Sequence, residues 1–167
     1  MELSVAAALK QVGEPFRLDL TEPIEALSFG GGEIEFAAPL RLSGTYVFNG
    51  KEFTVAATAD TVLRANCARC AVSFDEPYTF SVSERFVKAS EADPDENPYA
   101  YLGDRIDLTK AVLDNLFLQL PLVSLCRPDC KGLCPVCGQD RNTTTCGCQP
   151  TEAGGPFTVL SALEEEE

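Results

Sequence analysis

The stretch that decides how this chain folds is residues 126–148, CRPDCKGLCPVCGQDRNTTTCGC, which places six cysteines within 23 residues. Within it, the run CPVCG at 134–138 is typical of a metal-binding turn. Two residues between the sulfurs let one tight turn aim both thiolates at one ion, and the glycine lets the backbone curl back. The run CGC at 146–148 supplies a second close pair. Together the two pairs predict a four-thiolate site of the structural zinc type.

Two more cysteine pairs extend this pattern, in the runs CRPDC at 126–130 and CARC at 67–70. We therefore predict eight metal ligands: Cys67, Cys70, Cys126, Cys130, Cys134, Cys137, Cys146 and Cys148. Four pairs could hold two zinc ions, one ion with spare thiols, or a cluster that shares thiolates. Iron–sulfur clusters also take four thiolates, but a short, polar, turn-rich module favours zinc. All-thiolate ligation leaves no open position for a catalytic water, which favours a structural role.

Composition and charge narrow the function classes. The chain has 167 residues, with 26 Asp and Glu against 13 Lys and Arg, a net charge of −13. Such an excess argues against a broad electrostatic grip on nucleic acid. The absence of histidine excludes His-dependent mechanisms, and no Walker-type phosphate loop is present. We therefore expect no enzymatic activity and no small-molecule substrate. With no secretory signal and no apolar run of the roughly 20 residues that a membrane span needs, we expect a cytoplasmic protein.

Alternating apolar and polar residues predict strands over 16–20 and 33–36, and a β-hairpin over 40–59 that turns at Asn49-Gly50. Apolar residues at even positions from Val72 to Phe86 predict a further long strand. Residues 1–15 lack such a pattern and are expected to be loosely docked.

A helix is expected to open at Asp107 and to end at Pro121, with an apolar face that packs on the sheet. The predicted fold class is α+β: an antiparallel β-sheet or small barrel with one main covering helix and a C-terminal Cys-rich zinc module. The predicted domains are a β-rich domain with its closing helix (1–120), the Cys-rich zinc-binding module (121–150), and a linker, short helical segment and acidic tail (151–167).

The motifs resemble one known family. The run CARC at 67–70, the helix over 106–121, the run DCKGLCPVCGQDRN at 129–142 and the run PFTVLSAL at 156–163 occur in the same order as in the YceD family. These are the large ribosomal RNA subunit accumulation proteins of bacteria and plastids. The resemblance implies a non-enzymatic factor in ribosome biogenesis that supports accumulation or processing of large-subunit ribosomal RNA. Its expected partner is a large-subunit rRNA precursor or a basic ribosomal or RNA-processing protein.

Five cations flank the cysteines and are candidate contacts to RNA or another partner: Arg64, Arg69, Arg127, Lys131 and Arg141. They could instead offset the charge of the metal sites, because four thiolates around Zn²⁺ leave a charge of −2. Two other functions stay open at this point. One is a thiol redox protein that uses the Cys67–Cys70 pair, which requires a lowered thiol pKa and metal-free cysteines. The other is a zinc-ribbon protein adaptor.

Overall fold

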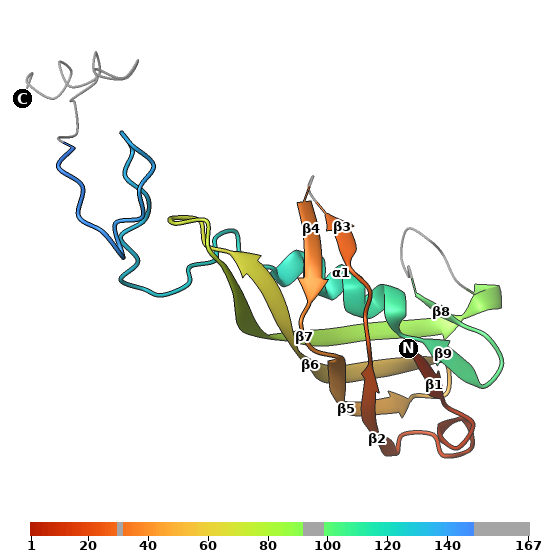
Figure 1. Cartoon of the computed structure of the whole chain (residues 1–167). Coiled ribbons are helices and arrows are strands. Elements are labelled where there is room, and N and C mark those ends of the chain that lie inside the picture. Colours follow the sequence, from red (N-terminus) through yellow and green to blue (C-terminus); the bar gives the residue numbers. More distant parts are fainter. Residues whose placement is uncertain (30–31, 92–98, 149–167) are drawn as a thin grey trace, which may run out of the picture. The chain divides into compact units, whose positions relative to one another are not determined.

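A computed structural model describes residues 1–29, 32–91 and 99–148 (Figure 1). The segment predicted as linker, short helix and acidic tail, 151–167, lies outside the described residues. The chain divides into two compact units. We call residues 1–65 and 73–124 the β unit, and residues 66–72 and 125–167 the Cys-rich unit. This division differs from the predicted boundary at 120/121, because it groups the CARC loop with the C-terminal cysteines.

The fold is α+β, a mostly antiparallel sheet with one α-helix. Its elements are β1 (Glu2–Ser4), a 3₁₀ turn (Ala8–Lys10), β2 (Pro15–Glu22), β3 (Leu27–Phe29), β4 (Gly32–Phe36), β5 (Leu40–Phe48), β6 (Glu52–Asn66), β7 (Ser73–Lys88), a second 3₁₀ turn (Ala89–Glu91), β8 (Ala100–Tyr101), β9 (Arg105–Asp107) and α1 (Thr109–Gln119). The main sheet runs β2–β5–β6–β7–β8, with β4 and β3 continuing on from β6, and β8 joins β7 in parallel. No pairing between the described strands joins β2 to β8, so the structure has a sheet and not a closed barrel.

The predicted hairpin is formed by β5 and β6, which pair antiparallel from Phe48↔Phe53 outward. The Asn49 N–H donates to the Glu52 carbonyl at 3.1 Å, so Gly50 and Lys51 form the tip of the turn, one residue later than predicted. Gly50 has φ 99°, which explains why glycine is placed there. The Asn49 side-chain oxygen accepts two backbone N–H groups of the same turn, and this fixes the strand register.

Strand β7 also shows the predicted alternation. Phe80, Val82 and Phe86 are buried, while Ser81, Ser83 and Arg85 between them are exposed. They join the core of the β unit, whose fully buried large side chains are Leu18, Leu40, Leu42, Phe53, Val55, Ile106, Leu108, Leu116 and others. The even-numbered pattern fails at its first member. Val72 is 51% exposed, because it belongs to the Cys loop and not to the strand.

The expectation of a loosely docked start, residues 1–15, is wrong. Strand β1 pairs with β9, and the side chains of Leu3, Val5 and Ala8 are buried in the core of the β unit. The segment is too short for a period-2 pattern to be recognised, since only three residues form the strand. Its burial is decided by a partner strand about a hundred residues further along the chain.

Helix α1 packs against β7 through Ala111, Val112 and Leu116. The Asp107 carboxylate accepts the Thr109 N–H at 2.9 Å and so stabilises the start of the helix, but from one residue before the N-cap, Leu108, which makes no side-chain cap. The apolar face is narrower than predicted, because Leu118 is 83% exposed. Within the described residues, no helix combines the length and apolarity that a membrane crossing requires.

Candidate metal centres

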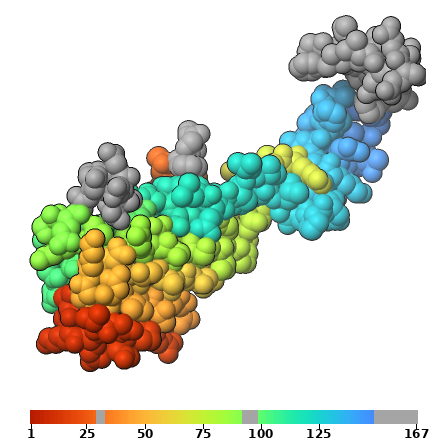
Figure 2. All heavy atoms as spheres, turned by 180° about the vertical axis from the view of Figure 1, so that it is seen from behind, coloured from red at the N-terminus to blue at the C-terminus, as the bar shows by residue number. Residues whose placement is uncertain are grey.

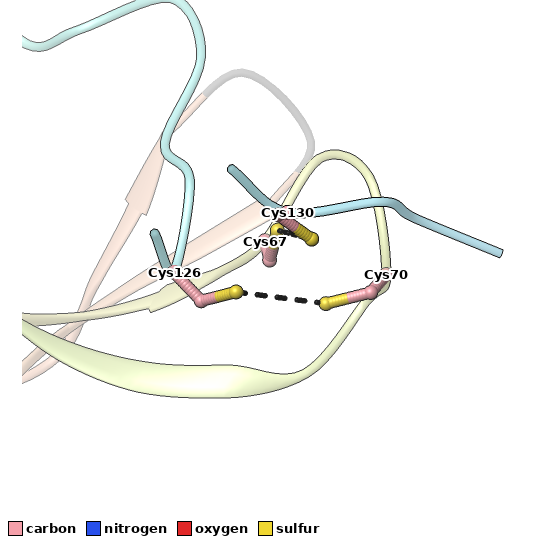
Figure 3. Close-up of side chains that lie close together, drawn as sticks. All are labelled: Cys67, Cys70, Cys126 and Cys130. Atoms are coloured by element: carbon pink, nitrogen blue, oxygen red, sulfur yellow. Dashed lines mark hydrogen bonds between the residues drawn. The ribbon is translucent and has the colours of Figure 1, made fainter. Parts of the chain in front are cut away.

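The eight cysteines form two groups of four within the Cys-rich unit. The first group, Cys67, Cys70, Cys126 and Cys130, joins the loop after β6 to the chain after α1 (Figure 3). Its Sγ atoms lie 3.8 Å apart in the pair Cys67–Cys130 and 3.7 Å apart in the pair Cys70–Cys126. A disulfide requires about 2.05 Å between sulfurs, so these cysteines are not paired as disulfides.

The second group, Cys134, Cys137, Cys146 and Cys148, is built from residues close in sequence. In both groups all four Sγ atoms lie within 4.8 Å of one another, near enough for one ion to be bound by all four. Tetrahedral zinc with bonds of about 2.3 Å separates its sulfur ligands by about 3.8 Å, which matches the spacings in the first group. Each group can therefore hold one metal ion, and the partition into 67/70/126/130 and 134/137/146/148 resolves the pairing that spacing alone left open.

Two turns of the same backbone geometry bring these thiols together. In the first, the Cys67 N–H donates to the Val72 carbonyl at 2.9 Å, and the Ala71 N–H donates to the Cys67 carbonyl at 2.8 Å. In the second, the Cys134 N–H donates to the Gln139 carbonyl at 2.8 Å, and the Gly138 N–H donates to the Cys134 carbonyl at 2.9 Å. The same pair of bonds at the same sequence offsets shows that CARC and CPVC form turns of the same backbone geometry.

The residue after each turn has a left-handed backbone. Gly138 has φ 71°, whereas Ala71 has φ 59° and is the one described non-glycine residue with positive φ. This conformation costs a non-glycine residue about 1–2 kcal/mol. A glycine at position 71 would remove this strain. Because the first turn has alanine there, the contacts around the turn must hold Ala71 in the left-handed conformation.

Asn142 connects the two groups, although the sequence pattern assigns it no role. Its Nδ2 donates to Cys130 Sγ at 3.4 Å and to Asp140 Oδ1 at 2.7 Å. Its Oδ1 accepts the Lys131 N–H and an Arg127 N–H, each at 2.8 Å. An amide from the loop of the second group thus supports a thiol of the first. The only sequence signal was an asparagine at a fixed place in the Cys-rich motif.

Hydrogen bonding lowers the pKa of one thiol in each group to about 6 in the metal-free chain. At Cys67 the chief cause is the backbone N–H of Cys126, and at Cys134 it is the backbone N–H of Cys137. Other thiols of the two groups have a raised pKa. Burial and the neighbouring thiols raise the pKa of Cys126 to about 12, and the Cys137 thiol, with burial, raises that of Cys148 to about 12. A cluster of thiols can ionise fully only when a cation neutralises it, as a bound metal ion does.

The five candidate cations have different surroundings. The Arg64 guanidinium lies 3.0 Å from Asp75 and 3.9 Å from Glu35, within the β unit. Arg69 donates to the carbonyls of Pro128 at 3.3 Å and Cys130 at 2.9 Å, so its guanidinium links the first turn to residues 128–130.

The other three cations belong to the C-terminal part of the Cys-rich unit. Arg127 donates to Asn142 and lies 3.5 Å from Asp129. The side chains of Lys131 and Arg141 have no hydrogen bond or ion pair to the described residues, and both line one hollow of about 240 Å³.

These features define a class: a β-sheet protein with two four-cysteine groups of metal-site geometry on a separate Cys-rich unit. A family model for Large ribosomal RNA subunit accumulation protein YceD matches residues 55–164, about two thirds of the chain. The chain therefore belongs to the YceD family. The match begins within β6 and covers both cysteine groups.

Individual relatives are more distant. An uncharacterized protein of Mycobacterium leprae is 28% identical over 109 residues, which cover 63% of this chain and 50% of that protein. The maize protein named Large ribosomal RNA subunit accumulation protein YCED homolog 1, chloroplastic, is 43% identical over 51 residues, 30% of this chain and 17% of the maize protein. The uncharacterized protein YlbN of Bacillus subtilis is 25% identical over 129 residues, 76% of this chain and 75% of that protein.

The chain spans half or less of the length of the first curated relatives it matches. No solved structure matches it.

Proposed function

We propose that this protein is a non-enzymatic factor that supports the accumulation of large-subunit ribosomal RNA, with two structural zinc ions that hold its Cys-rich unit in shape. The observation that carries the proposal is the pair of four-thiolate groups within a chain of the YceD family. Few bulky apolar residues lie in residues 125–148, so the ions take the place of a hydrophobic core.

The spacing of the sulfurs supports zinc over an iron–sulfur cluster. A single ion keeps its four ligands about 3.8 Å apart, whereas a cluster of several iron atoms separates them further. Sγ atoms that all lie within 4.8 Å of one another suit the single ion. Four thiolates also fill the coordination sphere of zinc, which supports a structural role and the proposal that the protein is not an enzyme.

The distribution of charge suggests where RNA would be contacted. Residues 66–72 and 125–148 carry four of the 13 basic residues and only two of the 26 acidic ones. Among these four, Lys131 and Arg141 are the two without a partner in the described residues, and they share a hollow with the hydroxyl-bearing Thr144 and Thr145. Cations and hydroxyls together are typical of a contact to phosphate oxygens. We therefore assign the RNA contact to Lys131 and Arg141.

Depletion of the protein in its own cells tests this function. The expected result is a fall in large-subunit rRNA relative to small-subunit rRNA, restored by the wild-type chain. The double variant Lys131→Ala/Arg141→Ala should restore it poorly, whereas Arg17→Ala, an exposed arginine of the β unit, should restore it fully. An unchanged rRNA ratio on depletion would refute the function, and full rescue by the double variant would refute the assigned contact.

Native mass spectrometry, combined with a thiol count on the denatured protein, separates this proposal from a thiol redox role. Two zinc ions with eight reduced thiols are expected. The lowered pKa of Cys67 would also suit a redox thiol. A metal-free protein with a Cys67–Cys70 disulfide would therefore replace the structural proposal by the redox one.

A further inference from the structure

A second surface lies on the β unit, apart from the cysteines. A hollow of about 510 Å³ is bounded by the C-terminal end of α1 and by strands β4, β6 and β7. Its apolar lining includes Ile34, Leu63, Tyr78, Phe117, Leu118 and Leu122. Nothing in the proposed contact to RNA uses these residues.

Two leucines at the border of this hollow are almost fully exposed. Leu118, in the last turn of α1, is 83% exposed, and Leu122, three residues beyond the helix, is 102% exposed. Helix α1 and the segment after it, turquoise in Figure 2, form part of the molecular surface. A small-molecule pocket encloses its ligand, whereas leucines that project beside a shallow hollow are typical of a surface that another macromolecule covers.

The border of the hollow is acidic. Glu33 and Glu76 line it, and its one lining cation in the described residues, Arg64, is already bound by Asp75 and Glu35. This local excess of carboxylates agrees with the β unit as a whole, where residues 1–65 and 73–124 hold 19 acidic and nine basic residues.

The end of α1 adds to this negative potential. The last carbonyls of a helix carry partial negative charge and favour a cation nearby. The last turn of α1 has no basic residue of its own. The Gln119 carbonyl accepts the Tyr78 hydroxyl, and within the described residues the one cation that lines the hollow, Arg64, is bound by Asp75 and Glu35 and supplies no positive charge to the helix end. A partner can supply that charge.

We propose that this hollow, together with Leu118 and Leu122, docks an amphipathic segment of a basic partner protein. Its apolar side chains would cover the two leucines, and its lysines or arginines would meet Glu33, Glu76 and the end of α1. RNA phosphates, or a second copy of this chain with the same charge of −13, would meet this border unfavourably. The proposal goes beyond the contact to RNA and rests on other residues, so each can fail without the other.

Fluorescence anisotropy with zinc-loaded, full-length protein tests the docking surface. The probe is a labelled peptide of sequence LKKLLKLLKKLLKL, which presents leucines on one helical face and lysines on the other. Leu118→Ser/Leu122→Ser should weaken binding at least about tenfold. The matched control is Leu102→Ser, because Leu102 is 80% exposed but lies outside the hollow. This control should bind within about twofold of the wild type.

Charge is tested with Glu33→Lys against Glu14→Lys, an exposed glutamate elsewhere on the β unit. Glu33→Lys should lower affinity about three- to tenfold at low salt, and the loss should shrink as salt is added. Equal affinity for the leucine variant and its control would overturn the proposal. So would equal binding of a peptide in which every lysine is replaced by glutamate. Dimerisation that the two leucine substitutions abolish, seen in sedimentation velocity, would assign the surface to a second copy instead.

Discussion

Asn142→Ala should weaken metal binding at the first cysteine group, although Asn142 lies in the loop of the second group. Its amide donates to Cys130 Sγ at 3.4 Å, so the substitution removes a hydrogen bond to a thiolate of the first group. A hydrogen bond to a charged group is worth about 1.5–3 kcal/mol, which corresponds to a roughly ten- to hundredfold loss of zinc affinity. The Lys131 N–H also loses its acceptor, so the upper part of that range is expected.

The two groups are measured separately by removing one at a time. A Cys134→Ser/Cys148→Ser background keeps only the first group, and Cys67→Ser/Cys126→Ser keeps only the second. Zinc affinity is then measured by competition with a chromophoric chelator. Asn142→Ala should act in the first background and change affinity less than about threefold in the second.

The control is Gln139→Ala, an exposed side chain of the same loop that has no hydrogen bond in the described residues. Asn142→Asp provides a second check. It keeps the acceptor oxygen but replaces the donor with a negative charge beside the thiolate, so its loss should exceed that of Asn142→Ala. A larger effect on the second group than on the first would refute the reasoning.

Three further predictions follow from the backbone and the thiols. Ala71→Gly should strengthen zinc binding at the first group by about 1 kcal/mol, because it relieves φ 59°, and Gly138→Ala should weaken zinc binding at the second group by a similar amount. The same chelator titration measures both affinities, and changes of the same sign in the two variants would contradict the reasoning. Gly44→Ala should lower the free energy of unfolding by at least about 2 kcal/mol, because the new Cβ would lie 2.5 Å from the Cα of Ala57, and urea unfolding with an unchanged midpoint would contradict this. Acid should release zinc, because protons compete for the thiolates. In the metal-free chain the thiols with pKa lowered to about 6 are ionised above that pH, and a bound cation stabilises these thiolates further, so native mass spectra should show the loss of zinc only at a pH below about 6. Retention of both ions at about pH 4.5 would argue against thiolate ligation.

Local patterns predicted much of the β unit. The hairpin of β5 and β6, the alternation along β7 and the start of α1 beside Asp107 all depend on residues close together in the sequence. The errors have a different origin. Strand β1 is held by β9, and Leu118 is exposed although it fits the apolar pattern of the helix, so tertiary contacts decide both.

The same limit applies to the metal centres. The sequence identifies all eight cysteines as candidate ligands, but spacing cannot tell which pairs share an ion. Cys70 and Cys126 are 56 positions apart, and only the fold brings their sulfurs together. The role of Asn142 could not be predicted either, because an amide in a polar loop has many other uses. Nothing in the sequence separates Lys131 and Arg141 from the three neighbouring cations that the structure shows to be engaged.

The first cysteine group also constrains the order in which the chain can mature. Its ligands lie on either side of a segment that contains β7, β8, β9 and α1. During synthesis the ribosome must therefore release residues up to Cys130 before this group can bind metal. By then β1 to α1 have already left the exit tunnel. The second group, confined to residues 134–148, needs no such distant partner. Metal binding at the first group, as proposed, would close a loop of more than fifty residues, and it would come after the whole β unit has been synthesised.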